Sequence, residues 1–207
     1  GAPAAMAATA AAAAAARRIN LWSLPRCAST ATMYAFAQRA DTRVFDEPLY
    51  AAYLAAHPEQ QRPYREELLR TGEKDAGAVV ARIILGPAEP ERPVRFFKNI
   101  ATQFMPTLDR AFLREADHFI LVRHPYRVIA SYYKALGTAA VHDTGLPRML
   151  ELCNELDKIK YDALVLDNSD ILGDPASSLQ RICSRFGLDY TPRMLTWKTG
   201  GKTLGFW

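Results

Sequence analysis

Short apolar runs alternate with amphipathic segments along most of the chain. Each run is bounded by turn-forming or charged residues, which is typical of a buried strand. The predicted strands are residues 19–24, 44–45, 94–97, 118–122 and 163–166. Apolar residues at helical spacing predict helices at residues 29–38, 49–56, 63–69, 76–85, 106–114, 125–135, 146–160 and 174–187. This alternation predicts a three-layer α/β fold, with helices on both faces of a short, mostly parallel sheet.

The N-terminal residues differ in composition from the rest of the chain. Residues 1–5 look like an expression remnant, and an Ala-rich run then leads to Arg17 and Arg18. A secretory signal has its charges before the apolar stretch, whereas here they follow it. We therefore expect a flexible tail at residues 1–18 and one domain at residues 19–207. Organelle targeting by this Ala-rich segment is the alternative.

Composition narrows the classes of partner and compartment. The net charge is +4, and no dense Lys/Arg run marks a surface for nucleic acid, so a small anionic ligand is favoured. Three scattered cysteines argue against a disulfide framework and favour a reducing compartment, which we expect to be the cytoplasm. The sequence contains no apolar stretch of membrane-spanning length and no His, Cys, Asp and Glu cluster with metal-ligand spacing, so neither a membrane span nor a metal is predicted.

The loop after the first predicted strand has the features of an anion site. Residues 25–30 read PRCAST and lead directly into a helix, whose first N–H groups and dipole favour a negative charge. Arg26 adds a positive charge, and Ser29 or Thr30 is expected to cap the helix. The alternative is a capped helix beside a surface arginine. Cys27 either has a thiol pKa lowered by the helix start or simply packs in the loop.

Counting residues tests two other kinds of phosphate loop. A nucleotide P-loop requires glycines and a lysine at fixed positions, and this loop has neither. A cysteine phosphatase would need an arginine six residues after its nucleophile, where this chain has Met33.

A second candidate anion site follows the fourth predicted strand. Arg123 ends that strand, Pro125 suits the first turn of a helix, and Ser131 lies eight residues after Arg123. Arg123 and Ser131 can face one phosphate if the chain folds back at the proline. Alternatively, the Ser131 hydroxyl bonds the backbone of its own helix.

Together these two segments resemble the superfamily of sulfotransferases that use 3′-phosphoadenosine 5′-phosphosulfate (PAPS). That family has a P-R/K-S-x-S-T loop after its first strand, and a later strand ending in Arg, then Pro, then Ser eight residues after the Arg. The chain is most similar to plant, algal and bacterial sulfotransferase-like proteins, often labelled "branched-chain aminotransferase-like". The matching stretches are residues 21–54, 64–69, 118–134 and 197–207. No lysine lies in a context that argues for a pyridoxal Schiff base.

The resemblance implies a P-loop-like sulfotransferase fold, PAPS as donor, adenosine 3′,5′-bisphosphate (PAP) as product, and no metal. It implies three groups of binding residues. The 5′-phosphosulfate would contact Arg26, Ser29 and Thr30, with backbone help from Cys27, Ala28 and Ala31. The 3′-phosphate would contact Arg123 and Ser131, and a late loop over the nucleotide would contain Gly200, Gly201 and Lys202.

Catalytic residues are expected at the ends of the second and third strands. Glu47 resembles the glutamate that several carbohydrate-type members use as general base, and the alternative is a helix cap. Lys98, together with Arg26, would steady the sulfuryl group or the leaving oxygen, and the alternative for Lys98 is a surface lysine. Related sequences often carry a histidine beside that lysine, where this chain has Asn99.

The acceptor predicted from this resemblance is a small-molecule hydroxyl or amine. It would enter near Glu47 and Lys98, over the helices of residues 49–85. Two alternatives are a P-loop-like small-molecule kinase and a catalytically silent nucleotide-binding module. Close relatives continue beyond the residue matching Trp207, so the alternatives are a truncated sequence and a variant with a shortened C-terminus.

Overall fold

All five predicted strands are present and form one parallel sheet in the order β2-β3-β1-β4-β5. The computed structural model describes residues 16–60, 62–137 and 140–197. The strands are β1 (Arg17–Ser23), β2 (Thr42–Asp46), β3 (Val94–Ile100), β4 (Asp117–Val122) and β5 (Leu164–Asp167). Since β3 is longer than predicted, Lys98 and Asn99 belong to the sheet and do not follow it.

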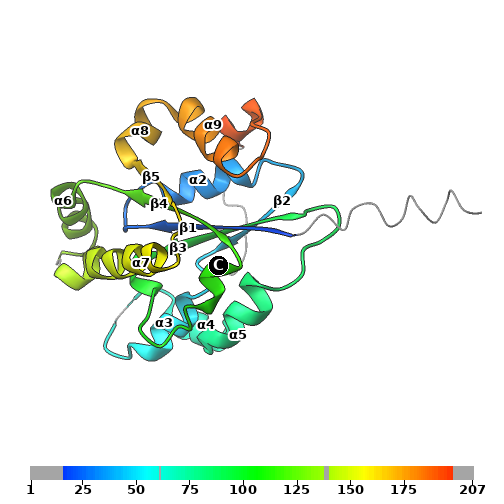
Figure 1. Cartoon of the computed structure of the whole chain (residues 1–207). Helices are drawn as coiled ribbons and strands as arrows, with labels where there is room; N and C mark the ends of the chain where they lie inside the picture. Colours follow the sequence, from blue (N-terminus) through cyan, green and yellow to red (C-terminus); the bar gives the residue numbers. More distant parts are fainter. Residues whose placement is uncertain (1–15, 61, 138–139, 198–207) are drawn as a thin grey trace, which may run out of the picture.

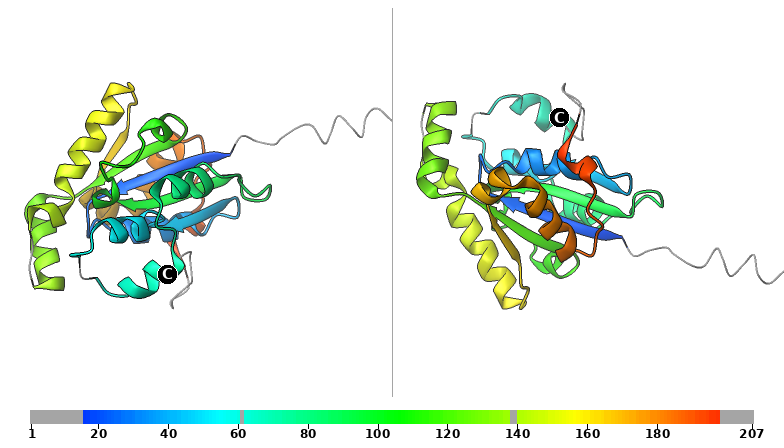
Figure 2. Two further views of the ribbon diagram at one scale, coloured as in Figure 1. Left: turned by 90° about the horizontal axis from the view of Figure 1, so that it is seen from below. Right: turned by 90° about the horizontal axis from the view of Figure 1, so that it is seen from above.

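Helices cover both faces of this sheet (Figures 1 and 2). The α-helices are α2 (Ser29–Phe36), α3 (Tyr50–Ala56), α4 (Arg65–Thr71), α5 (Ala76–Ala78), α6 (Pro125–Leu136), α7 (Leu146–Lys158), α8 (Asn168–Gly173) and α9 (Pro175–Arg185). A π-helix, Val79–Ile84, continues α5. Figure 1 shows α2, α8 and α9 on one side of the sheet and α3, α4 and α5 on the other. The predicted three-layer α/β architecture is confirmed.

The strand order creates a switch point beside the central strand. After β1 the chain crosses to β2 at one edge, and after β4 it continues to β5 at the opposite edge. Because the strands are parallel, their carboxyl ends lie along one rim of the sheet, and ligands of such folds bind at that rim near the switch point. The loops after β1, β2 and β4 are therefore the segments to examine.

Aromatic side chains fill the space between sheet and helices. Phe96 on β3 stacks on Phe36 of α2 with ring centroids 4.2 Å apart, and Phe97 stacks on Phe45 of β2 at 4.9 Å. Phe96 and Phe97 are adjacent in a strand, so they point to opposite faces. The Phe96–Phe36 contact thus fixes one face of the sheet to α2, whereas the Phe97–Phe45 contact joins neighbouring strands on the opposite face.

Three local predictions were wrong. Residues 106–114 form a turn followed by the 3₁₀ helix Ala111–Arg114, and no α-helix. The apolar side chains that suggested a helix, such as Leu108, are buried individually from this turn. The short helix α8 after β5 was not predicted. Neither Ser29 nor Thr30 caps α2, since Ala28 occupies the N-cap position in a left-handed conformation.

The remaining 3₁₀ segments are Ala101–Gln103, Val141–Thr144 and Pro192–Leu195. None of the described helices combines the length and the apolar character needed to cross a membrane.

A buried histidine lies at the centre of the sheet. The Trp22 indole Nε1–H donates to His118 Nδ1 at 3.2 Å, and His118 Nε2 lies 3.0 Å from the Leu113 carbonyl oxygen. A ring that accepts at Nδ1 and donates at Nε2 is neutral. Burial lowers the pKa of His118 to about 4, and the bond to Leu113 only partly offsets this effect. His118, for which the sequence indicated no partner, is therefore a structural residue.

We predict that His118 makes the stability depend on pH between about 6.5 and 4. In this range the unfolded chain binds a proton at this residue while the folded chain does not, so the free energy of unfolding decreases as the pH falls. The expected loss at His118 is about 2 kcal/mol between pH 7 and pH 5. Urea denaturation at both pH values measures it. His118→Asn, which keeps an acceptor for Trp22, should lose this part of the pH dependence; an unchanged difference between the two pH values would contradict the assignment.

Candidate functional site

The loop between β1 and α2 has an unusual backbone. Arg26 and Ala28 both adopt positive φ angles, 64° and 58°, which side chains other than glycine rarely tolerate. Alternating backbone conformations of this kind turn successive N–H groups toward one concave surface and make an anion-binding nest. Because such conformations cost free energy, their persistence points to a functional constraint on the loop.

The start of α2 completes this concave surface. No side chain caps the helix, and its first turn has no acidic residue. The backbone N–H groups of the first turn have no partner within the helix, and with the helix dipole they favour an anion. Because Ala28, and not Ser29 or Thr30, occupies the N-cap position, the first N–H groups of α2 remain accessible to a ligand.

The segment after β4 contacts this loop. The Arg123 guanidinium Nη1 donates to the Arg26 carbonyl oxygen at 2.8 Å, and Arg26 Nε donates to Ser131 Oγ at 3.4 Å. Among the described residues, Arg123 Nε is buried without a hydrogen-bond partner. An unsatisfied guanidinium N–H at a cavity wall is suited to an anionic ligand. His124 lies outside this arrangement and stacks on Tyr126.

These segments enclose a cavity of 440 Å³, here called the anion cavity. Its lining combines the first loop, the ends of β2 and β3, and the second loop. The residues are Pro25, Arg26, Cys27, Ala28, Ser29, Thr30, Glu47, Lys98, Ile100, Arg123 and Ser131. Three positive side chains face one carboxylate, so the cavity is complementary to a ligand with more than one negative charge.

A buried charge cluster forms one wall of the anion cavity. The register of β2 and β3 places Asp46 opposite Lys98, and Glu47 follows Asp46. Lys98 Nζ donates to Asp46 Oδ1 at 2.9 Å and to Glu47 Oε1 at 2.5 Å. The Lys98 side chain is only 5% exposed, so the surface-lysine alternative is wrong.

Two opposing effects act on the charge of Lys98. Burial disfavours the ammonium, but the neighbouring carboxylates of Glu47 and Asp46 outweigh burial and raise the pKa of Lys98. Lys98 is therefore a fixed positive charge at neutral pH.

Gln103 is a site residue that the sequence analysis missed. Its amide Nε2 donates to Glu47 Oε2 at 2.5 Å, and its side chain is almost fully buried. With Lys98 on the other oxygen, both oxygens of the Glu47 carboxylate are fixed. Glu47 itself has a positive φ of 47°, and its carbonyl oxygen accepts from Tyr50 N at 2.9 Å. Leu49 occupies the N-cap position of α3 and no side chain caps this helix, so the capping alternative for the Glu47 side chain is wrong, and that side chain lines the cavity.

Asn99, where relatives often have histidine, lies away from the cavity. It alternates with Lys98 along β3, is fully buried, and donates to Asn20 Oδ1 at 3.2 Å. The substitution therefore removes no group from the cavity wall.

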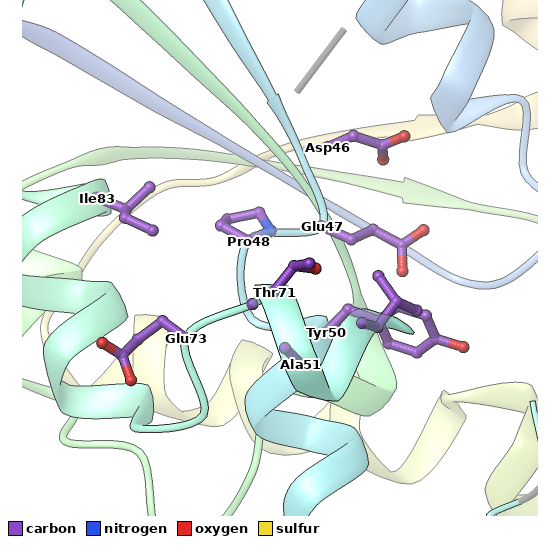
Figure 3. Close-up of a pocket in the computed structure, with 10 residues that line it drawn as sticks. Asp46, Glu47, Pro48, Tyr50, Ala51, Thr71, Glu73 and Ile83 are labelled. Carbon is purple, nitrogen blue, oxygen red and sulfur yellow. The ribbon is translucent and has the colours of Figure 1, made fainter. Parts of the chain in front are cut away.

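A second cavity of 310 Å³, here called the acidic cavity, adjoins the first at Glu47. It lies between the end of β2 and the helices α3, α4 and the π-helix. Its lining is Asp46, Glu47, Pro48, Tyr50, Ala51, Leu68, Thr71, Gly72, Glu73 and Ile83 (Figure 3). Gly72 allows α3 and α4 to approach closely, since an added Cβ would lie 2.5 Å from Ala51 Cβ. This is the region over residues 49–85 where the sequence predicted acceptor entry.

A third cavity, of 480 Å³, begins on the other side of Ala28 and is here called the apolar cavity. Ala31 lines this cavity and not the anion cavity, and Leu172, Leu195 and Trp197 form its opposite side. Ala28 lines both cavities. The predicted late-loop residues Gly200, Gly201 and Lys202 lie outside the described residues.

Cys27 packs in the loop. Burial raises the pKa of its thiol to about 12, with the nearby Arg123 only partly opposing this effect. The thiolate is therefore absent at neutral pH, and of the two alternatives for Cys27 the packing role holds. In the described part of the chain, no three His, Cys, Asp or Glu side chains gather as metal ligands would.

Comparison with known proteins identifies the family. A sulfotransferase domain model matches residues 17–207. A curated relative, branched-chain-amino-acid aminotransferase-like protein 2 of Arabidopsis thaliana, is 36% identical over 88% of this chain, and the chain spans only 32% of that relative's length.

Solved structures show the same fold at low sequence identity. A sulfotransferase from Alicyclobacillus acidocaldarius has a TM-score of 0.57 at 14% identity, covering 88% of this chain and 86% of the other. Mouse sulfotransferase SULT7A1 complexed with PAP has a TM-score of 0.51 at 15% identity, covering 91% and 69%.

We predict that Lys98 is structurally indispensable to the charge cluster. Lys98→Met leaves the Asp46 and Glu47 carboxylates buried without their shared cation, and it should lower the free energy of unfolding by about 3–5 kcal/mol. The matched control is Lys158→Met, because Lys158 is 68% exposed and pairs with Glu155 on the surface. Its effect should stay below about 1 kcal/mol. Chemical denaturation at pH 7 measures both, and equal effects would contradict the prediction.

Proposed function

The chain belongs to the sulfotransferase domain family, and on this basis we propose that it transfers a sulfuryl group from PAPS to a small-molecule hydroxyl or amine. The observation that carries the proposal is the convergence of two sequence-distant anion-binding segments on one cavity that also contains a paired lysine and carboxylate. These are the Arg26 loop, the Arg123 and Ser131 segment, and the Lys98–Glu47 pair.

The described cavities fit the chemistry of the proposed donor. PAPS carries a phosphosulfate and a separate 3′-phosphate, and the anion cavity supplies Arg26, Arg123 and the open start of α2 for these groups. The unpartnered Arg123 Nε supports a further anionic contact in this region. The adenine would occupy the apolar cavity, reached past Ala28. There Trp197 stacks on Tyr34 with centroids 5.9 Å apart and offers an aromatic wall.

Glu47 is the proposed general base. The acceptor hydroxyl loses its proton to the Glu47 carboxylate as its oxygen bonds to sulfur. The bond from sulfur to the bridging phosphate oxygen breaks at the same time, and PAP leaves with that electron pair. Gln103 and Lys98 would hold the carboxylate in one orientation, because each donates to a different oxygen.

Lys98 and Arg26 are proposed to stabilise the negative charge of the leaving phosphate. An ammonium has three N–H donors, and within the described residues two of those on Lys98 are used by Asp46 and Glu47. The third is available to the anion cavity, which Lys98 lines. The raised pKa of Lys98 keeps this donor charged at neutral pH.

We predict that the protein binds PAP more tightly than ADP or ATP, because only PAP carries a 3′-phosphate for Arg123 and Ser131. Arg26→Ala and Arg123→Ala should each weaken PAP binding by about tenfold or more. Arg43→Ala is the control, since Arg43 is exposed and pairs with Glu89 outside the three cavities. Calorimetric titration measures these affinities. Equal affinity for PAP, ADP and ATP would contradict the proposal that PAPS is the donor.

We also predict that Glu47→Gln lowers kcat by about 10²–10⁴-fold while PAP binding stays within about threefold of the wild type. The amide keeps the size of the carboxylate but cannot accept the proton. The matched control is Asp46→Asn, which changes the other carboxylate on Lys98 and should cost much less turnover. Initial rates with PAPS and an acceptor panel provide the measurement, and an unchanged kcat in Glu47→Gln would remove Glu47 from the mechanism.

A further inference from the structure

The two cavities that share Glu47 have opposite electrostatic character. The anion cavity presents Arg26, Lys98 and Arg123. The acidic cavity is lined by three carboxylates, Asp46, Glu47 and Glu73, and its described lining contains no lysine, arginine or histidine. An anionic donor is thus attracted to one cavity and repelled from the other, and the molecule that enters the acidic cavity must have a different charge.

The negative charge of the acidic cavity is only partly compensated. Asp46 and Glu47 share the single ammonium of Lys98, which leaves that cluster one negative charge in excess. Glu73 Oε1 accepts from Asp75 N at 3.1 Å, and Arg82 Nη1 lies 3.8 Å from Glu73 Oε2, with the Arg82 side chain 79% exposed. An exposed pair of this kind contributes little. The Glu73 carboxylate therefore remains able to bind a cation.

The acidic cavity has a carboxylate at each end and less polar residues between them. Figure 3 shows Glu47 and Glu73 at opposite ends of the lining, with Pro48, Thr71 and Ala51 between them. Leu68 and Ile83 add further apolar surface. At 310 Å³ the cavity suits a small molecule with a short apolar middle and a polar group at each end.

We propose that the acceptor is a small amino alcohol, which places its hydroxyl at Glu47 and its protonated amine at Glu73. The inference rests on the proposed function for the identity of the reaction, but its charge preference rests on the cavity alone. Nearby carboxylates favour the ammonium over the free amine. An ammonium has no lone pair with which to attack sulfur, so the amine anchors the molecule and the hydroxyl is the nucleophile.

Tyr50 adds a neutral polar group at the reacting end. Burial, together with the charge of Glu47, raises the pKa of Tyr50 to about 12, so the phenol keeps its proton at neutral pH. The Glu47 end thus combines a neutral hydroxyl with a proton-accepting carboxylate and suits an uncharged alcohol, whereas the Glu73 end suits a cation.

A charge-matched ligand series tests this proposal. The probes are linear amino alcohols with two to six carbons, each compared with the alkanol and the hydroxycarboxylate of the same length. Affinity is measured by calorimetry on the protein both without PAP and with saturating PAP, and kcat/KM is measured separately with PAPS. The variants are Glu73→Gln and, as a matched control, Glu67→Gln, because Glu67 lies on the preceding helix α4 and outside the acidic cavity.

The best amino alcohol should bind at least roughly tenfold more tightly than its hydroxycarboxylate, since like charges in this cavity repel. Glu73→Gln should bring the two within roughly threefold and leave alkanol affinity unchanged, whereas Glu67→Gln should keep the full preference. Equal or tighter binding of the hydroxycarboxylate or the alkanol by the wild type overturns the proposal, as does a preference that Glu73→Gln leaves intact.

The same experiment separates the inference from the proposed function. If PAP binds but no amine preference is found, the acceptor inference fails and the donor proposal stands. If the amine preference is found without PAP, while PAP itself does not bind, the donor proposal fails and the charge preference of the cavity stands.

Discussion

The arrangement of the site depends on one buried cation shared by two carboxylates. The parallel register of β2 and β3 sets Lys98 beside Asp46, and the turn after β2 brings Glu47 to the same ammonium. A buried charge without these partners would cost several kcal/mol, so the three side chains hold each other in place. Because Glu47 lines both the anion cavity and the acidic cavity, this cluster also forms the boundary between them.

Backbone strain is concentrated where the ligand is expected. Of the described non-glycine residues with positive φ, Arg26, Ala28 and Glu47 all line the anion cavity. Each of these conformations is unfavourable by itself and persists only where surrounding contacts stabilise it, which here come from the adjoining sheet. Arg123, bonded to the Arg26 carbonyl oxygen, connects the strained loop to the strand on the other side of β1. The loop is therefore preorganised, which reduces the entropy lost when an anion binds.

The division of charge between the cavities gives each a separate role. Positive side chains and an uncapped helix start favour an anionic ligand on one side of Glu47, and partly compensated carboxylates disfavour it on the other. The Glu47 carboxylate at the shared boundary can then accept a proton from a second molecule, while the positive side chains of the anion cavity bind the negative charges of the first. The family assignment by itself identifies no acceptor, whereas this polarity supports a cationic group on the proposed acceptor.

The sequence by itself determined the strands and the fold class, because periodicity is a local property of the chain, and it proposed Arg26, Arg123 and Ser131 as anion-binding residues. Only the tertiary structure decided what depends on distant segments meeting. It placed Lys98 in a buried charge cluster and brought the Gln103 amide within hydrogen-bonding distance of Glu47. It also showed that Ala31 lines the apolar cavity and that Glu73 and Glu47 line the same acidic cavity. The apolar spacing of residues 106–114 predicted a helix that did not form, since packing of single anchors such as Leu108 outweighed local propensity. Burial and strand register, which set these contacts, arise only when the sheet is assembled.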